Sequence, residues 1–135
     1  MMFHMKKTIS FQTSIDNMFL AEKFIDSLTT EYGISEDLYG NILMATTEAV
    51  VNAIKHGNKL DSSKFVFVDA EVQDNMLSIS VKDEGLGFDF TVLPDPTLTE
   101  NILKFSGRGI YLIKSLSDQV EFLEGGSLIK ISFKL

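Results

Sequence analysis

Glutamate, asparagine and lysine recur at helical spacing in the stretch EAVVNAIKHGN, which covers residues 48–58. At about 100° per residue, Glu48, Asn52 and Lys55 fall within an arc of roughly 60° around a helix. Glu48 and Asn52 are one turn apart, so their side chains can converge on one point. A carboxylate and an amide oxygen close together suit a hard divalent cation or a water. The glutamate can instead act as a general base, and the lysine can reach an anion such as phosphate.

A solvated helix flank is the simpler explanation of the same three polar residues. Against it, small side chains at Ala45, Ala49 and Ala53 line the helix beside the polar groups. Small side chains leave room for a ligand next to a helix. The residues alone leave both interpretations open.

A carboxylate falls on the apolar face of an expected strand. In NMLSISVKD, Leu77, Ile79 and Val81 share one face by alternation, and the same parity places Asp83 on that face. A buried carboxylate without a partner costs on the order of several kcal/mol. Asp83 therefore needs hydrogen-bond donors, and the amine of a ligand could supply one. The alternative is an ordinary turn with a capping aspartate.

Two glycine pairs follow this strand. Gly85 and Gly87 in DEGLGF permit positive φ and a close approach of the backbone to a flat group. Gly107 and Gly109 in SGRGIYLIKSL stand where a helix is expected to begin, and free amides at a helix N-terminus favour phosphate. Arg108 adds a cation between them. Each G-x-G pattern on its own is also typical of an ordinary turn or helix start.

Helical and alternating apolar patterns predict the order β-α-α-β-β-α-β-β. Ser14 and Ser35 are the expected helix N-caps, and Gly57 is the expected residue C′ after the second helix. The loop at 88–106 is long for a chain of this size, and loops of that length are often lids. The expected bounds are an edge strand at 6–13, helices at 14–32 and 35–56, strands at 64–72 and 75–83, a helix from 106–109 to Leu116, and a hairpin turning at Gly125–Gly126.

Each expected strand has one apolar face, which indicates a mostly antiparallel sheet covered on one side by helices. The predicted fold class is therefore α+β, a two-layer sandwich. The length fits a single domain over residues 1–135 with a real core. The aromatic residues are assigned to core or dimer packing: Phe19, Phe24, Phe65, Phe67 and Phe133.

Composition narrows the range of partners and of chemistry. The net charge of −7 makes nucleic acid and anionic membranes poor partners. The chain has no cysteine, which excludes disulfides, thiolate zinc sites and cysteine nucleophiles. The start MMFHMKK lacks the apolar segment of a signal peptide, and no apolar run approaches the roughly 20 residues of a membrane span. We therefore expect a cytoplasmic protein.

The three motifs together, in this order, resemble those of the GHKL ATPase superfamily. EAVVNAIKHGN is similar to its N box, DEGLGF to its first glycine box and SGRGIYLI to its second. Within the superfamily, the chain most resembles the small bacterial anti-sigma-factor serine/threonine kinases, whose domains are of this size. The ending DQVEFL…GGSLIKISF is also similar to theirs. The resemblance implies the Bergerat ATP-binding fold, with a mixed, mostly antiparallel sheet.

The resemblance also implies ATP and Mg²⁺ as cofactors and a role for each matching residue. Glu48 would polarise the attacking hydroxyl or water, Asn52 would hold Mg²⁺, and Lys55 would touch phosphate. Asp83 would accept a hydrogen bond from the adenine amino group. Gly85 and Gly87, in the first glycine box, would line the base. The residues of the second glycine box would close over the phosphates, and these are Gly107, Arg108 and Gly109.

The implied function is that of an ATP-dependent protein kinase and anti-sigma factor. It would phosphorylate an anti-sigma-factor antagonist on serine and would alternatively sequester a sigma factor, and family members commonly form homodimers. One alternative is a catalytically inactive, nucleotide-dependent binding module, against which Glu48 argues. A histidine-kinase catalytic domain is disfavoured because neither histidine, His4 nor His56, lies in a preceding two-helix phosphoacceptor domain. His56 is expected to be a structural contact or a helix cap.

Overall fold

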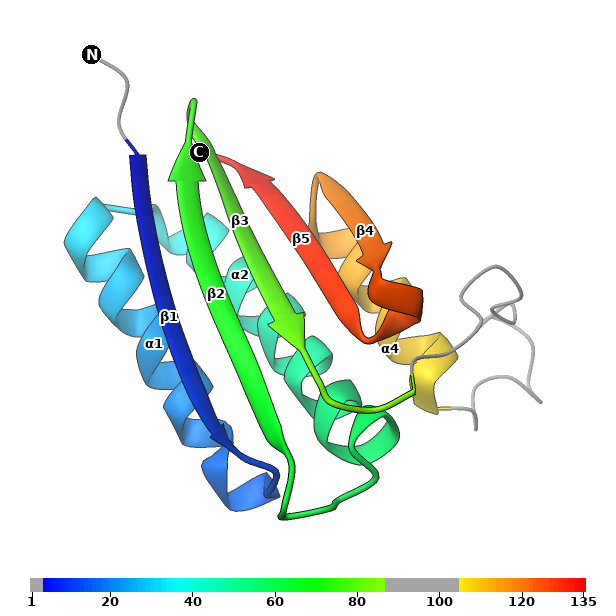
Figure 1. The fold of residues 1–135 in the computed structure, drawn as a ribbon. Helices are drawn as coiled ribbons and strands as arrows, with labels where there is room; N and C mark the ends of the chain where they lie inside the picture. Colours follow the sequence, from blue (N-terminus) through cyan, green and yellow to red (C-terminus); the bar gives the residue numbers. More distant parts are fainter. Residues whose placement is uncertain (1–3, 87–104) are drawn as a thin grey trace.

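The computed structural model describes residues 4–86 and 105–135. One sheet in this part of the chain has the strand order β1-β2-β3-β5-β4 (Figure 1). All pairings between its neighbouring strands are antiparallel, so the expectation of a mostly antiparallel sheet is confirmed. The strands are β1 (His4–Gln12), β2 (Phe65–Gln73), β3 (Met76–Lys82), β4 (Gln119–Leu123) and β5 (Leu128–Lys134).

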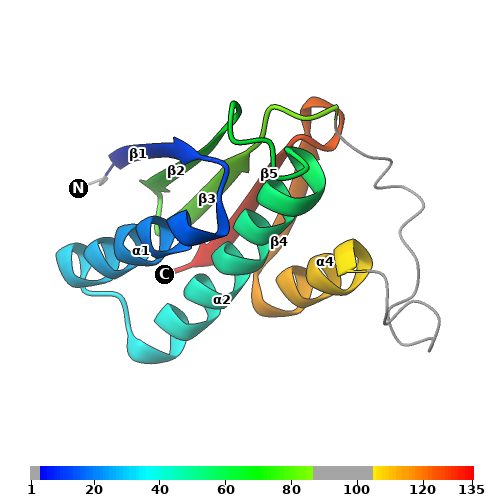
Figure 2. The same cartoon turned by 90° about the horizontal axis from the view of Figure 1, so that it is seen from below.

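Three helices cover one face of this sheet in the described residues, so the fold is the expected two-layer α+β sandwich (Figure 2). They are α1 (Met18–Tyr32), α2 (Glu36–Asn52) and α4 (Phe105–Leu116). Both predicted N-caps are present, since the Ser14 hydroxyl accepts from the Asp16 N–H and the Ser35 hydroxyl accepts from the Leu38 N–H. The Ser14 cap starts a short 3₁₀ turn (Ile15–Asn17) that leads into α1. Gly33 ends α1 in the left-handed conformation at φ 63°.

The hairpin between β2 and β3 fixes the parity on which the sequence interpretation depends. Asp74 and Asn75 turn the chain with φ of 54° and 61°, as a tight two-residue hairpin requires. In the resulting register, Val68 pairs with Val81 and Val72 pairs with Leu77. Alternate residues of both strands therefore face the helices, and Asp83 comes directly after β3 on that buried side.

The end of α2 differs from the prediction. The helix continues into a π-helical turn (Ala53–Gly57), and the Asn58 N–H donates to the Ala53 carbonyl oxygen at 2.8 Å. Gly57 is not in the left-handed conformation, so its assignment as residue C′ was wrong. The glycine is required by space: a Cβ atom there would overlap the carboxylate of Asp83.

The core fills the space between the sheet and the helices. It includes Ile42, Ala45 and Ala49 of α2 and the aromatic side chains of Phe24 and Phe133. The exposed fractions of Phe19 and Phe65 are 48% and 38%, so these two rings are available for contacts outside the core.

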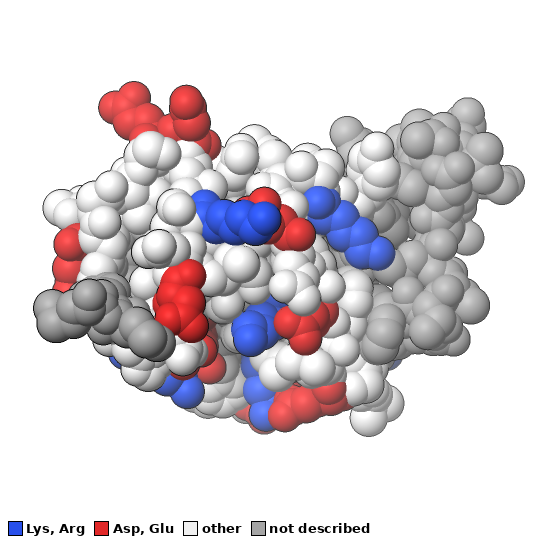
Figure 3. Space-filling model, turned by 90° about the horizontal axis from the view of Figure 1, so that it is seen from above, with Lys and Arg blue, Asp and Glu red and all other residues white. Residues whose placement is uncertain are grey.

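The uncovered face of the sheet carries polar side chains together with the neighbouring rings of Phe65 and Phe67. At the end of the sheet seen in Figure 3, lysine side chains lie among aspartates and glutamates rather than in a patch of one sign. On the open face, Ser78 and Ser132 are linked by a hydrogen bond of 3.1 Å. No helix in the described ranges is both long enough and apolar enough to cross a membrane.

Candidate functional site

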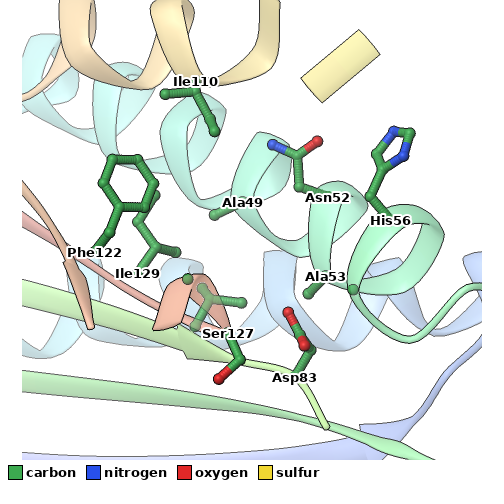
Figure 4. A pocket seen from close by; sticks show the side chains of 12 residues that line it. Ala49, Asn52, Ala53, His56, Asp83, Ile110, Phe122, Ser127 and Ile129 are labelled. Atoms are coloured by element: carbon green, nitrogen blue, oxygen red, sulfur yellow. The ribbon is translucent and has the colours of Figure 1, made fainter. Parts of the chain in front are cut away.

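A cavity lies where α2, α4 and the ends of β3 and β5 meet (Figure 4). Its empty volume, which includes solvent space at its open mouth, is about 640 Å³. Most of its wall is apolar, and a few polar groups point into it. The residues that line it are Ala49, Asn52, Ala53, His56, Gly57, Val81, Asp83, Ile110, Phe122, Gly126, Ser127 and Ile129.

Asp83 is the buried carboxylate of this cavity, with 9% of its surface exposed. Its Oδ1 atom accepts a hydrogen bond of 2.8 Å from the Gly85 N–H, and no other group in residues 4–86 and 105–135 donates to the carboxylate. Burial raises the pKa of Asp83, while the Gly85 N–H and the charge of Lys64 oppose the shift. A buried carboxylate with spare acceptor capacity at a cavity wall is a candidate ligand-binding group.

Two glycines allow the backbone to close around Asp83. A Cβ atom on Gly57 would overlap the Asp83 carboxylate, and a Cβ atom on Gly85 would overlap the Gly57 carbonyl group. The end of α2 and the turn after β3 are therefore in backbone contact at this point. Neither glycine has positive φ, so close approach is the reason for both.

Asn52 and Glu48 come together at another part of the site. A Cβ atom on Gly109 would lie 3.1 Å from the Asn52 amide nitrogen and 3.2 Å from the Glu48 Oε2 atom. Gly109 belongs to α4, so the carboxylate and the amide of α2 face the N-terminal half of α4. The Asn52 Oδ1 atom is buried and has no hydrogen-bond partner among the described residues. A buried, unpaired amide oxygen is costly unless a ligand or water satisfies it.

The remaining predicted site residues are Lys55, Gly87, Gly107 and Arg108. Lys55 is exposed and is not among the cavity-lining residues. Gly107 and Arg108 lie in the first turn of α4, which is consistent with the prediction that a helix begins near them. Gly87 lies outside the described residues, as does most of the loop expected to be a lid.

Several cavity residues were not singled out from the sequence. His56, which was expected from the sequence to be a structural contact or a helix cap, follows Asn52 by one turn and is also among the residues that line the cavity (Figure 4). Burial, and then the nearby charge of Lys55, lower the pKa of His56. Phe122 and Ile129 form the opposite wall (Figure 4). Their strand pattern shows that they face inward, but only the tertiary fold shows that they face an open cavity.

The geometry suits a ligand with a flat ring and a polar tail. Apolar side chains such as Ala53, Ile110 and Phe122 can cover the faces of a ring, and Asp83 can accept from an amino group at its edge. Asn52 and Glu48, facing the start of α4, lie where an anionic tail and a cation can be bound. Such a cavity in an α+β sandwich is consistent with a nucleotide-binding domain.

Comparison with known proteins agrees with this class. The model of the histidine kinase-like ATPase domain matches residues 11–133. The chain therefore belongs to this ATPase family, as the resemblance of its three motifs indicated.

Similar proteins of comparable length occur in several bacteria. The chain is 28% identical to the anti-sigma F factor of Clostridium perfringens over 118 residues, which are 86% of this chain and 84% of that protein. It is 22% identical to the serine-protein kinase RsbW of Listeria monocytogenes, over 96% of this chain and 88% of that protein.

A solved structure shares the fold. The crystal structure of the RsbU and RsbW domains of Rv1364c from Mycobacterium tuberculosis superposes with a TM-score of 0.64 at 17% identity. The match covers 96% of this chain and 31% of the solved chain, so the chain spans about a third of that larger protein.

Proposed function

We propose that the protein is an ATP- and Mg²⁺-dependent serine/threonine protein kinase that acts as an anti-sigma factor and phosphorylates an anti-sigma-factor antagonist. The observation that carries the proposal is the meeting of Glu48 and Asn52 at Gly109, beside a cavity that also contains Asp83. This arrangement offers a base, a cation ligand and an adenine acceptor within one site. The names of the similar proteins, anti-sigma F factor and serine-protein kinase RsbW, support the choice of substrate and partners.

Adenine would be bound at the Asp83 end of the cavity. The carboxylate has acceptor capacity beyond its bond to Gly85, and the 6-amino group of adenine is a donor. The glycine contact between Gly57 and Gly85 leaves the backbone close to the base, and Gly87 would extend that surface. Phe122 and Ile110 would exclude water from the ring faces.

The residues present fit a magnesium ion that is bound mainly through the nucleotide. Asn52 supplies a buried amide oxygen that has no partner within residues 4–86 and 105–135, and such an oxygen is a neutral hard ligand. The described residues contain no group of three or more histidine, aspartate or glutamate side chains that could hold a metal without a nucleotide. Mg²⁺ is commonly held in this way, by one or two protein oxygens together with phosphates. When bound, the ion would neutralise charge on the transferring phosphate.

Transfer would depend on Glu48 and on the start of α4. Glu48 would orient the serine hydroxyl of the substrate and accept its proton. Gly107, Arg108 and Gly109 would place backbone amides and one cation against the phosphates. Lys55, exposed at the end of α2, would reach the phosphate tail from outside the cavity. Such positioning and charge neutralisation are most of what phosphoryl transfer requires.

The test is a transfer assay with ATP labelled in the γ-phosphate, Mg²⁺ and a purified candidate antagonist. We expect labelled phosphoserine on the antagonist, and labelling that is slower by about 10²–10⁴-fold with the Glu48→Gln variant. Tight ATP binding without phosphoserine on any candidate would instead favour a nucleotide-dependent binding module. Gel filtration with a sigma factor, with and without ATP, would test the anti-sigma role, and the elution volume of the chain alone would test the homodimer.

A further inference from the structure

Asn58, the residue after the π-helical turn, has 1% of its surface exposed, and its amide group is fully hydrogen-bonded. Its Nδ2 atom donates to the Thr13 hydroxyl at 2.8 Å and to the Phe65 carbonyl oxygen at 2.9 Å. Its Oδ1 atom accepts from the Glu84 N–H at 2.7 Å. A backbone carbonyl can only accept and a backbone N–H can only donate, so these partners fix which way the amide points.

Two of these three bonds, to Thr13 and Glu84, join segments that are far apart in the sequence. Thr13 follows β1, Phe65 begins β2, and Glu84 belongs to the turn after β3. The Asn58 backbone N–H also closes the π-helical turn by its bond to Ala53. The Asn58 side chain and backbone therefore link the end of the π-helical turn to the ends of three neighbouring strands.

The bond to Glu84 acts directly on the geometry of Asp83, its neighbour in the chain. The Asp83 N–H donates to the Ser127 carbonyl oxygen at 2.9 Å, and the next N–H along the chain is held by Asn58. The third N–H, from Gly85, donates to the Asp83 carboxylate. Three successive amides are thus fixed, and the middle one is fixed by Asn58.

Close packing leaves the carboxylate little freedom in this position. Gly57 precedes Asn58 and lies against the Asp83 carboxylate. Asn58 therefore holds both sides of this contact, the glycine through its own backbone and the aspartate through Glu84. Losing its amide would release the turn after β3 from the end of α2.

We propose that Asn58 is a positioning residue for base recognition. By fixing the turn that carries Asp83, it makes the cavity select adenine, which has an amino group at the ring position where guanine has a carbonyl group. This inference rests on the proposed ATP-binding function. With the carboxylate fixed, the guanine carbonyl oxygen meets a negative charge and is rejected. With the turn released, the carboxylate can move to accept from the ring N–H and amino group on the neighbouring edge of guanine.

The experiment is a calorimetric titration of the full chain with Mg²⁺-ATP, Mg²⁺-GTP and Mg²⁺-tripolyphosphate. The variants are Asn58→Ala and Asn58→Ser, the latter polar but too short to reach the Glu84 N–H and useful if the alanine variant does not fold. We expect the ratio of ATP to GTP affinity to fall about tenfold or more, as when a positioned polar group that discriminates between ligands is lost. The affinity for tripolyphosphate should stay unchanged, because this ligand has no base that could contact Asp83.

The matched control is Thr13→Val, which removes another bond of Asn58 while leaving its bond to Glu84. A residue that acts only on stability would lower the unfolding temperature in Asn58→Ser and Thr13→Val alike and leave the nucleotide ratio constant in both. If the wild-type protein prefers ATP and a folded Asn58 variant keeps the same ratio of ATP to GTP affinity, this inference is overturned while the proposed function stands. A wild-type protein without preference for ATP over GTP would overturn the inference together with the proposed function.

Discussion

Gly109 of α4 lies directly against Asn52 of α2, so closely that a Cβ atom on the glycine would come within 3.1 Å of the asparagine amide nitrogen. The same Cβ atom would lie 3.2 Å from a carboxylate oxygen of Glu48. The second glycine motif therefore has a packing reason as well as an anion-binding one. It lets the start of α4 approach the two polar residues that the proposed chemistry needs.

Replacing Gly109 by alanine should separate stability from activity. The atoms that a methyl group would meet are the ends of the Asn52 and Glu48 side chains, which can move, so the fold should survive. Displacement of these groups should slow phosphoryl transfer by up to about 100-fold. The unfolding temperature should not fall, because alanine favours a helix over glycine by about 0.5–1 kcal/mol. Transfer kinetics and thermal unfolding would be measured on the same preparation.

The control for Gly109→Ala is the same change at Gly40, in α2. Nothing lies within 4 Å of a Cβ atom there, so Gly40→Ala should raise stability by about 0.5–1 kcal/mol and leave transfer unchanged. Equal transfer rates in both variants would show that the contact of Gly109 with Asn52 and Glu48 is not needed for activity.

Asp83→Asn should weaken ATP binding while stabilising the free protein. Loss of a charged acceptor for the adenine amino group should reduce ATP affinity by about 10- to 150-fold, which corresponds to about 1.5–3 kcal/mol for a hydrogen bond to a charged group. An asparagine would still accept from the Gly85 N–H and would carry no buried charge. Isothermal titration with ATP and thermal unfolding without nucleotide would measure the two effects. Equal ATP affinity in variant and wild type would make the adenine assignment wrong.

The pH dependence of ATP binding should follow Asp83. Burial raises its pKa above the ordinary 3.8, so the carboxylate takes up a proton at a higher pH than an exposed aspartate and loses its charge. The affinity for ATP should therefore fall as the pH is lowered through this raised pKa. The Asp83→Asn variant is the control, because it keeps the titration of His56 and of the nucleotide but lacks the carboxylate. Identical pH profiles would contradict the prediction.

The raised pKa of Asp83 changes the stability of the free protein with pH in the direction opposite to its effect on ATP affinity. A carboxyl group whose pKa is raised by folding binds its proton more tightly in the folded state. Its contribution to stability is therefore present below the unfolded pKa and is lost as the pH rises through the folded pKa. Free Asp83→Asn protein should lack this part of the pH dependence of unfolding, which denaturant titrations across the acidic range would reveal.

The sequence predicted those parts of the site that follow from local periodicity. The two-residue period of β3 places Asp83 on the buried face, and the helical period of α2 places Glu48 beside Asn52. Both are properties of single elements, and a tight hairpin and a serine cap fix the elements in register. The two-layer fold follows from the same patterns, because each strand has one apolar face that must be covered.

What the sequence did not predict depends on contacts between distant segments. Gly57 was assigned to a left-handed helix end, the commonest reason for such a glycine, whereas its contact with Asp83 requires it instead. Asn58 is the last residue of the stretch EAVVNAIKHGN, but nothing in that stretch shows its role, which emerges only when Thr13, Phe65 and Glu84 surround it. No single-element pattern contains this information, because the partners are brought together by the sheet.

Asn52→Ala should abolish the effect of magnesium on nucleotide affinity. The Asn52 Oδ1 atom is buried beside the proposed phosphate site and has no hydrogen-bond partner in the described part of the chain, so its removal would take away the protein ligand of the ion. We expect the variant to bind ATP equally well with Mg²⁺ and with EDTA, whereas the wild type should bind more tightly with Mg²⁺. A magnesium effect of the same size in both proteins would exclude Asn52 as the metal ligand.

Glu48→Gln should leave nucleotide binding intact and remove most of the transfer activity. Glutamine keeps the size and one oxygen of the side chain beside Gly109 but cannot accept the proton of the serine hydroxyl. General-base groups contribute about 10²–10⁴-fold to rates, so single-turnover transfer to the antagonist should fall by that factor at unchanged ATP affinity. The matched control is Glu22→Gln on the exposed face of α1, which should transfer phosphate at the wild-type rate. If Glu48→Gln transferred phosphate as fast as this control, another group would have to be the base.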